Sequence, residues 1–223
     1  MWWLALACSP DPSGGDPCAA APASPGSIDE AVELFDALPR PLTVACVVAS
    51  LERPLGVEIT TGRFSAQPAY SDRSPRVFLM LPGLTLSVVP EGPGAPLLEF
   101  GEPLSTDPDG PGAHTVKGEL LFPIFDGIGA EDPFDRVSAG APDRSVCGTC
   151  HYDEVSVGDG RYASAPYRPV DETIVSVATL AGERDACDPA LEPDRCAMLA
   201  ALFDHGEVVR EPFPEGYGTI YEP

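Results

Sequence analysis

Apolar side chains recur every three or four positions in the segment 28–38, which places them on one face of a helix. Ser27 and Glu30 stand at the spacing of a capping box, in which the serine hydroxyl accepts a hydrogen bond from the amide three residues later. Pro39 ends the pattern, since proline cannot continue a helix. The spacing therefore predicts a helix over residues 28–37 whose apolar face packs against a core.

Runs rich in β-branched residues or alternating between apolar and polar residues, which are typical of strands, dominate residues 42–125. Turn-forming dipeptides such as Pro82-Gly83 separate the runs. Several short strands at this spacing are typical of an antiparallel sandwich or small barrel. The predicted strands are 42–48, 57–61, 77–81, 84–89, 97–100 and 116–122.

The second half of the chain predicts less regular structure. Glycine and proline interrupt residues 126–146, which indicates a linker or long loop. A helix is predicted over 188–205, with a proline near its start and Gly206 just past its end. The expected fold class is α+β, mainly β. An antiparallel β-sandwich-like body with a short N-terminal helix occupies 27–125, and a small helical and loop segment occupies 147–223.

Composition narrows the classes of function. The net charge is −22, so the surface repels phosphate backbones and nucleic-acid binding is not expected. The chain holds 27 Pro and 22 Gly, which favour short elements, and no apolar run approaches the roughly 20 residues of a membrane-spanning helix. Only three histidines are present and carboxylates are too numerous to single out a pair, so we expect a carrier or binding protein rather than an enzyme.

The pattern at the N-terminus predicts export. An apolar run from Met1 ends in small residues before Cys8, and it resembles the tail of a bacterial lipoprotein signal. The resemblance implies that 1–8 is a truncated signal and that Cys8 is lipidated. Residues 9–26 are small, polar or proline and predict a flexible tether. We therefore expect a bacterial cell-envelope protein, periplasmic or outer-membrane, that contacts the membrane only through its lipid.

One motif carries specific chemistry. Cys147-Gly148-Thr149-Cys150-His151 is a C-x-x-C-H sequence. Two thiols three positions apart can add to the two vinyl groups of one porphyrin, and the next residue then offers its imidazole to the iron. The motif resembles the haem attachment site of the c-type cytochromes. The resemblance implies one haem c, with thioether bonds to Cys147 and Cys150 and with His151 as the first iron ligand.

The second iron ligand has several candidates. Met198 and His205 are seven positions apart on the predicted helix 188–205, so they share one face. Met80 and His114 are the other methionine and histidine donors in the body. A methionine raises the reduction potential and a histidine lowers it, so this choice sets the redox properties.

Cysteine pairing fits an exported chain. After Cys8 six cysteines remain, and an even number is typical of disulfide pairing outside the cytoplasm. If haem takes the two motif cysteines, four remain with three alternative pairings. Joining Cys187 to Cys196 closes the shortest loop and leaves Cys18 with Cys46.

The motif has other interpretations. A structural alternative is that its cysteines form disulfides, with each other or each with a distant partner such as Cys46. They offer zinc three donors when His151 is included, although adjacent Cys150 and His151 fit one tetrahedral site poorly. Thiol exchange needs a similar spacing, but no preceding strand indicates a thioredoxin-like unit. The sequence thus predicts an envelope-anchored c-type haem protein for one-electron transfer or redox sensing, with a redox partner protein. The alternative is a haem-free, disulfide-stapled binding or scaffold lipoprotein.

Overall fold

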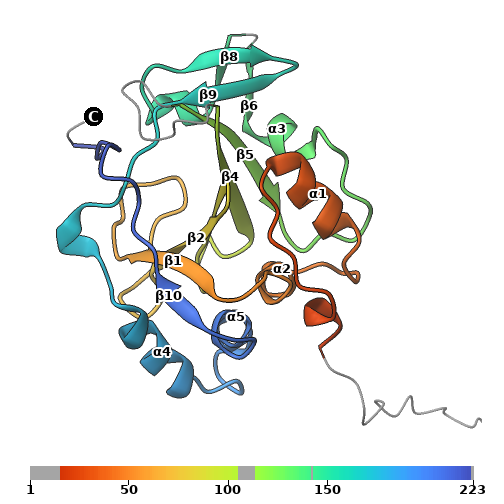
Figure 1. The fold of residues 1–223 in the computed structure, drawn as a ribbon, viewed down its shortest axis with the longest axis vertical. Coiled ribbons are helices and arrows are strands. Elements are labelled where there is room, and N and C mark those ends of the chain that lie inside the picture. Colours follow the sequence, from red (N-terminus) through yellow and green to blue (C-terminus); the bar gives the residue numbers. More distant parts are fainter. Residues whose placement is uncertain (1–15, 105–113, 142, 222–223) are drawn as a thin grey trace, which may run out of the picture.

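A computed structural model describes residues 16–104, 114–141 and 143–221, so Cys8 and the expected signal lie outside the described residues. The strands are β1 (Leu55–Thr60), β2 (Arg76–Leu81), β3 (Leu84–Val88), β4 (Leu97–Pro103), β5 (Thr115–Leu121), β6 (Ser138–Ala141), β7 (Arg144–Ser145), β8 (Val155–Gly158), β9 (Arg161–Ser164) and β10 (Val208–Arg210). Eight of them form one sheet in the order β10-β1-β2-β3-β4-β5-β9-β8, which runs in Figure 1 from β10 in the lower part to β8 at the top. All neighbours in it are antiparallel except β1 and β10.

Five α-helices accompany the sheet in the described part of the chain: α1 (Ile28–Asp36), α2 (Val44–Ala49), α3 (Asp132–Val137), α4 (Val177–Asp185) and α5 (Pro193–Phe203). Short 3-10 turns are η1 (Pro17–Ala19), η2 (Cys147–Thr149) and η3 (Asp171–Thr173). The expected class, α+β and mainly β, is confirmed. Within the described residues no helix is long and apolar enough to cross a membrane.

The central strands separate an apolar face from a polar face, because successive side chains of a strand point in opposite directions. Buried apolar residues of β1 to β5 form one core with residues of α1, α2 and α5. Helices, rather than a second sheet, therefore cover this face. The opposite face carries Arg76, Ser87, Glu99 and Lys117, and it lines a cavity.

Helix α1 forms as its sequence predicts. The Ser27 hydroxyl accepts from the amide of Glu30 at 3.1 Å, and the Glu30 carboxylate accepts from the amide of Gly26 at 2.7 Å. The amide of Ile28 donates to the Glu102 carboxylate of β4 at 2.8 Å, which ties the helix start to the sheet. These bonds satisfy amides that a helix start leaves without partners inside the helix.

The predicted strand 42–48 is wrong, because α2 occupies most of this segment. The Thr43 hydroxyl accepts from the amide of Cys46 at 3.1 Å and caps the helix. Cys46 is joined to Cys18, and most of the helix is buried in the core. Packing on several sides and a disulfide thus outweigh the strand preference of the valines, which is a weak local term.

The segment 126–146 is more ordered than a linker. It contains α3, and Arg136 of this helix pairs with Glu119 of β5 at 2.5 Å. The C-terminal segment is not separate from the sheet, since β9 pairs with β5 and β10 pairs with β1. Helix α5 begins at Pro193, five residues later than predicted. Helix α4, which precedes it, was not predicted, because it buries only Leu180 and so has no apolar periodicity in its sequence.

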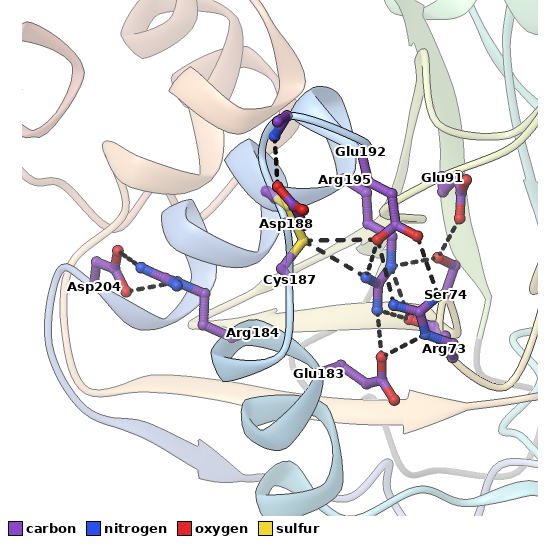
Figure 2. Close-up of a disulfide and its surroundings, with 12 residues drawn as sticks. Arg73, Ser74, Glu91, Glu183, Arg184, Cys187, Asp188, Glu192, Arg195 and Asp204 are labelled. Carbon is purple, nitrogen blue, oxygen red and sulfur yellow. Dashed lines mark hydrogen bonds and ion pairs between the residues drawn. A yellow bond between two sulfur atoms is a disulfide. The ribbon is translucent and has the colours of Figure 1, made fainter.

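A buried cation joins α4 and α5 (Figure 2). The side chain of Arg195 is 1% exposed and pairs with Glu183 at 2.6 Å and Glu192 at 2.8 Å. Its guanidinium also donates to the carbonyl of Arg73 at 2.8 Å. The disulfide between Cys187 and Cys196 lies against this cluster and closes the loop between the two helices.

Candidate functional site

The described cysteines divide into two bonded pairs and one unbonded pair. Cys18 is joined to Cys46 and Cys187 to Cys196, which confirms the pairing expected if the motif keeps its thiols. Cys147 and Cys150 are free. Cys46 is therefore not bonded to the motif, and neither Cys147 nor Cys150 forms a disulfide in this structure.

The motif adopts a short helical turn. The amides of Cys150 and His151 both donate to the carbonyl of Cys147, at 3.0 and 2.9 Å. Val146 precedes the turn, and its amide donates to the carbonyl of Val137 at the end of α3. The backbone thus holds the two thiols and the imidazole on one tight turn beside the sheet.

A carboxylate close in sequence braces this turn. Glu154 accepts from the amide of Ser145 at 2.7 Å and from its hydroxyl at 2.5 Å, and that hydroxyl accepts from the amide of Cys147 at 3.0 Å. A Cβ atom added to Gly148 would lie 2.6 Å from a Glu154 carboxylate oxygen, so a larger residue here would displace that carboxylate. Glu154 is partly buried in this role.

The imidazole of His151 is fixed in orientation. Its Nδ1 lies 2.7 Å from the carbonyl oxygen of Ala165, and a carbonyl can only accept, so Nδ1 carries the proton. Nε2 is then the unprotonated nitrogen that can bind a metal. The ring stacks on Tyr167 with centroids 5.0 Å apart and 12° between the planes. Burial, aided by the charge of Lys117, lowers the pKa of His151 to about 4 and keeps the ring neutral at physiological pH.

A cavity of about 400 Å³ adjoins the motif, and Cys147, Cys150 and His151 all line it. This volume lies within the range of ordinary ligand and cofactor sites. The polar face of β1 to β5 forms one side. The loop after β1 and the C-terminal tail supply aromatic side chains to the lining, namely Phe64, Phe213, Tyr217 and Tyr221.

Charged groups on the sheet side of the cavity are mostly paired. Arg76 lies 2.5 Å from Glu99 and donates to the Ser87 hydroxyl at 2.6 Å. Lys117, the one lysine of the chain, lines the cavity and donates to the Thr115 hydroxyl. Burial lowers the pKa of Lys117 to about 8.

The thiol of Cys147 is not activated. Burial raises its pKa to about 11, and the opposing effects of Ser145 and Lys117 are smaller. Thiol exchange requires a thiolate, which a low pKa supplies, so this site does not favour that chemistry. The motif also lacks the convergent donors of a zinc site, since no group of three close metal donors in the described residues includes its cysteines.

One group of close donors lies elsewhere, at Cys187, Glu192 and Cys196. The two sulfurs are bonded to each other, and the Glu192 carboxylate pairs with Arg73 and Arg195. Thiolate is the form of cysteine that binds metals, so a disulfide leaves this group without its sulfur ligands.

The candidates for the second iron ligand lie away from the cavity. Met198 is 4% exposed in the core on α5. His205 lies 3.5 Å from Asp16, and His114 Nε2 lies 2.8 Å from the carbonyl of Asp153. None of these three, nor Met80, lines the cavity.

Sequence reasoning missed Lys117, Tyr167 and Glu154. The signal for Lys117 was its rarity, because it is the single lysine beside twelve arginines and falls on the polar side of a predicted strand. Tyr167 and the Ala165 carbonyl had no local signal, since they reach His151 from fourteen or more residues away.

Comparison with protein-family models, curated proteins and solved structures finds no match to this chain. The site is therefore interpreted from its own geometry.

Proposed function

We propose that this chain is a c-type haem protein of the bacterial cell envelope that transfers single electrons or senses redox state. The observation that carries the proposal is the one unbonded cysteine pair of the described chain, placed with His151 on the wall of a cavity of about 400 Å³. Haem, when bound, supplies a reversible one-electron couple at its iron. Anchoring through Cys8 and docking of a redox partner belong to the same proposal.

The residues present suit the attachment. Each thiol of Cys147 and Cys150 would add across one vinyl group of the haem, so that a carbon–sulfur and a carbon–hydrogen bond would form and no group would leave. Both sulfurs must be reduced for this step, which agrees with the pairing of the other described cysteines among themselves.

His151 suits the role of iron ligand. Its Nδ1–H is held by a backbone carbonyl, the usual partner of a metal-binding histidine, and this fixes the tautomer with Nε2 available to iron. Phe213 and Tyr217 on the cavity wall would shield a flat apolar cofactor from water. Arg63 also lines the cavity and could offer positive charge to a carboxylate substituent, whereas Arg76 and Arg168 on the same wall pair with Glu99 and Asp171.

The test is expression in a host that exports the chain and attaches haem. We expect a red protein whose absorption changes on reduction and whose colour survives acid-acetone extraction. Peptide mapping should place one haem on the peptide with Cys147 and Cys150. Replacing both cysteines by alanine should abolish covalent haem, and His151→Gln should change the spectrum, whereas the control His205→Gln should not.

A colourless wild-type protein with its fold intact would reject the proposal. It would leave the haem-free binding or scaffold lipoprotein, in which the cavity takes a different ligand. An oxidised Cys147–Cys150 pair in that colourless protein would further support the scaffold interpretation.

A further inference from the structure

We infer that the side-chain amine of Lys117 is the second ligand of the haem iron. This inference rests on the proposed function and names the group that completes its site. The Lys117 amine would donate its lone pair to iron after releasing one proton to solvent, and no electron is transferred in that step.

The first argument is the composition of the cavity wall. Among the residues that the structure describes, His151 is the only histidine that lines the cavity, and no methionine lines it. The expected ligands lie elsewhere, with Met198 in the core and His205 beside Asp16. A second ligand from the described residues must therefore be another donor on this wall.

The second argument is that three other donors on this wall are engaged. Glu99 pairs with Arg76 at 2.5 Å and Glu119 pairs with Arg136 at 2.5 Å. Tyr167 stacks on the His151 ring and therefore lies on the same side of the site as the first iron ligand. Its hydroxyl accepts a hydrogen bond from the amide of Tyr152 at 3.3 Å.

The third argument is the setting of Lys117. Within the described residues no carboxylate lies at ion-pair distance from its amine, and the hydrogen bond that we find goes to the neutral hydroxyl of Thr115. A desolvated ammonium without a carboxylate partner is unfavourable, so the neutral amine is stabilised. The lowered pKa of about 8 agrees with this.

The sheet also leaves room for this amine. Lys117 of β5 lies opposite Gly101 of β4, which in turn lies opposite Thr85 of β3. Side chains opposite each other point to the same face, so the neighbour of Lys117 on that face is a residue without a side chain. Lys117 is also near enough to the motif for its charge to act on both Cys147 and His151.

The experiment compares the haem-loaded wild type with Lys117→Ala and Lys117→Met by ultraviolet-visible, near-infrared and electron paramagnetic resonance spectroscopy of the ferric state. The wild type should show low-spin iron with two nitrogen ligands. Lys117→Ala should lose the low-spin signal and become high-spin. Lys117→Met should introduce a sulfur-to-iron band and raise the reduction potential. Met198→Leu and His205→Gln are controls that should keep the wild-type spectrum.

A red Lys117→Ala protein with an unchanged low-spin spectrum would overturn this inference and leave the proposed function intact. A spectral change in Met198→Leu or His205→Gln instead would assign the ligand to that residue. A colourless wild type would reject the proposed function and this inference together.

Chemical labelling covers the case in which the Lys117 variants do not fold. The wild-type chain has a single lysine, so amine acetylation followed by peptide mapping reports on Lys117 alone. We expect Lys117 to be protected in the haem-loaded protein and modified in the haem-free Cys147→Ala/Cys150→Ala protein. Equal modification of both proteins would overturn the inference.

Discussion

The imidazole of His151 and the phenol ring of Tyr167 lie nearly parallel, with centroids 5.0 Å apart. Together with the bond from Nδ1 to the Ala165 carbonyl at 2.7 Å, this stacking fixes the ring in two directions. The motif thus presents a preorganised imidazole to the cavity before any ligand binds.

Replacing Tyr167 by leucine should remove the aromatic contact. We expect the free energy of unfolding to fall by about 1 kcal/mol, the usual contribution of an aromatic pair. Urea unfolding followed by circular dichroism measures it. Tyr167→Phe keeps the ring and loses only the hydroxyl that meets the Tyr152 amide, so it should stay close to wild type. Equal losses in both variants would contradict a role for the stacking.

The stability of the haem-free protein should depend on pH through His151. Burial lowers the pKa of His151 to about 4, whereas an unfolded histidine titrates near 6.5. Between these values the unfolded chain binds a proton that the folded chain does not. The contribution of neutral His151 is therefore complete above about pH 6.5 and is lost as the pH falls toward 4.

Urea unfolding of wild type and His151→Gln across this range isolates the effect from the other titrating groups. The difference between their free energies of unfolding should shrink steadily toward low pH. A constant difference for His151→Gln would mean that burial does not perturb this ring.

Gly148→Ala should destabilise the motif turn. Its Cβ would lie 2.6 Å from a carboxylate oxygen of Glu154, which would have to release its two bonds to Ser145. We expect a loss of about 2 kcal/mol, as for other hydrogen bonds to charged groups.

Two further variants check the cause of that loss. Gly182→Ala lies in α4 with nothing near the added atom, so it should be neutral or stabilise by up to about 1 kcal/mol. The double variant Gly148→Ala/Glu154→Ala should be no less stable than Glu154→Ala alone. Additive losses would show that the clash is not with Glu154.

The two disulfides should contribute to stability and not to haem attachment. Replacing Cys18 and Cys46 by alanine opens a span of 28 residues and should cost about 3.5 kcal/mol, and opening the span of 9 between Cys187 and Cys196 should cost about 2.5 kcal/mol. Thermal unfolding measures these losses. Covalent haem per chain should remain at the wild-type level in both, and its loss would show that a disulfide shapes the site.

Arg195→Ala should be among the most damaging substitutions outside the site. The change leaves Glu183 and Glu192 without their buried cation, and breaking such a pair costs about 3 kcal/mol or more. Arg73→Ala removes an exposed partner of the same two carboxylates and should cost far less. Similar losses in the two variants, measured by urea unfolding, would mean that burial of Arg195 adds nothing.

Local patterns were enough where neighbouring residues decide the structure. The capping pair Ser27 and Glu30 placed α1 correctly, and alternation placed β2, β3 and β5 within a residue or two. Prediction was wrong at 42–48, where burial and the bridge from Cys46 to Cys18 impose a helix. The sequence analysis also missed α4, because this helix has almost no apolar face and therefore no helical periodicity of apolar residues.

The sequence by itself determined the fold class, the strands β1 to β5, and the one motif with specific chemistry, because periodicity, capping and motif spacing are relations between near neighbours. Only the tertiary structure decided what surrounds that motif. Lys117 and Tyr167 line one cavity with His151, and the Ala165 carbonyl holds the imidazole, because sheet pairing and loop packing join segments far apart in the chain. Such contacts depend on burial of the whole core, which no local pattern encodes.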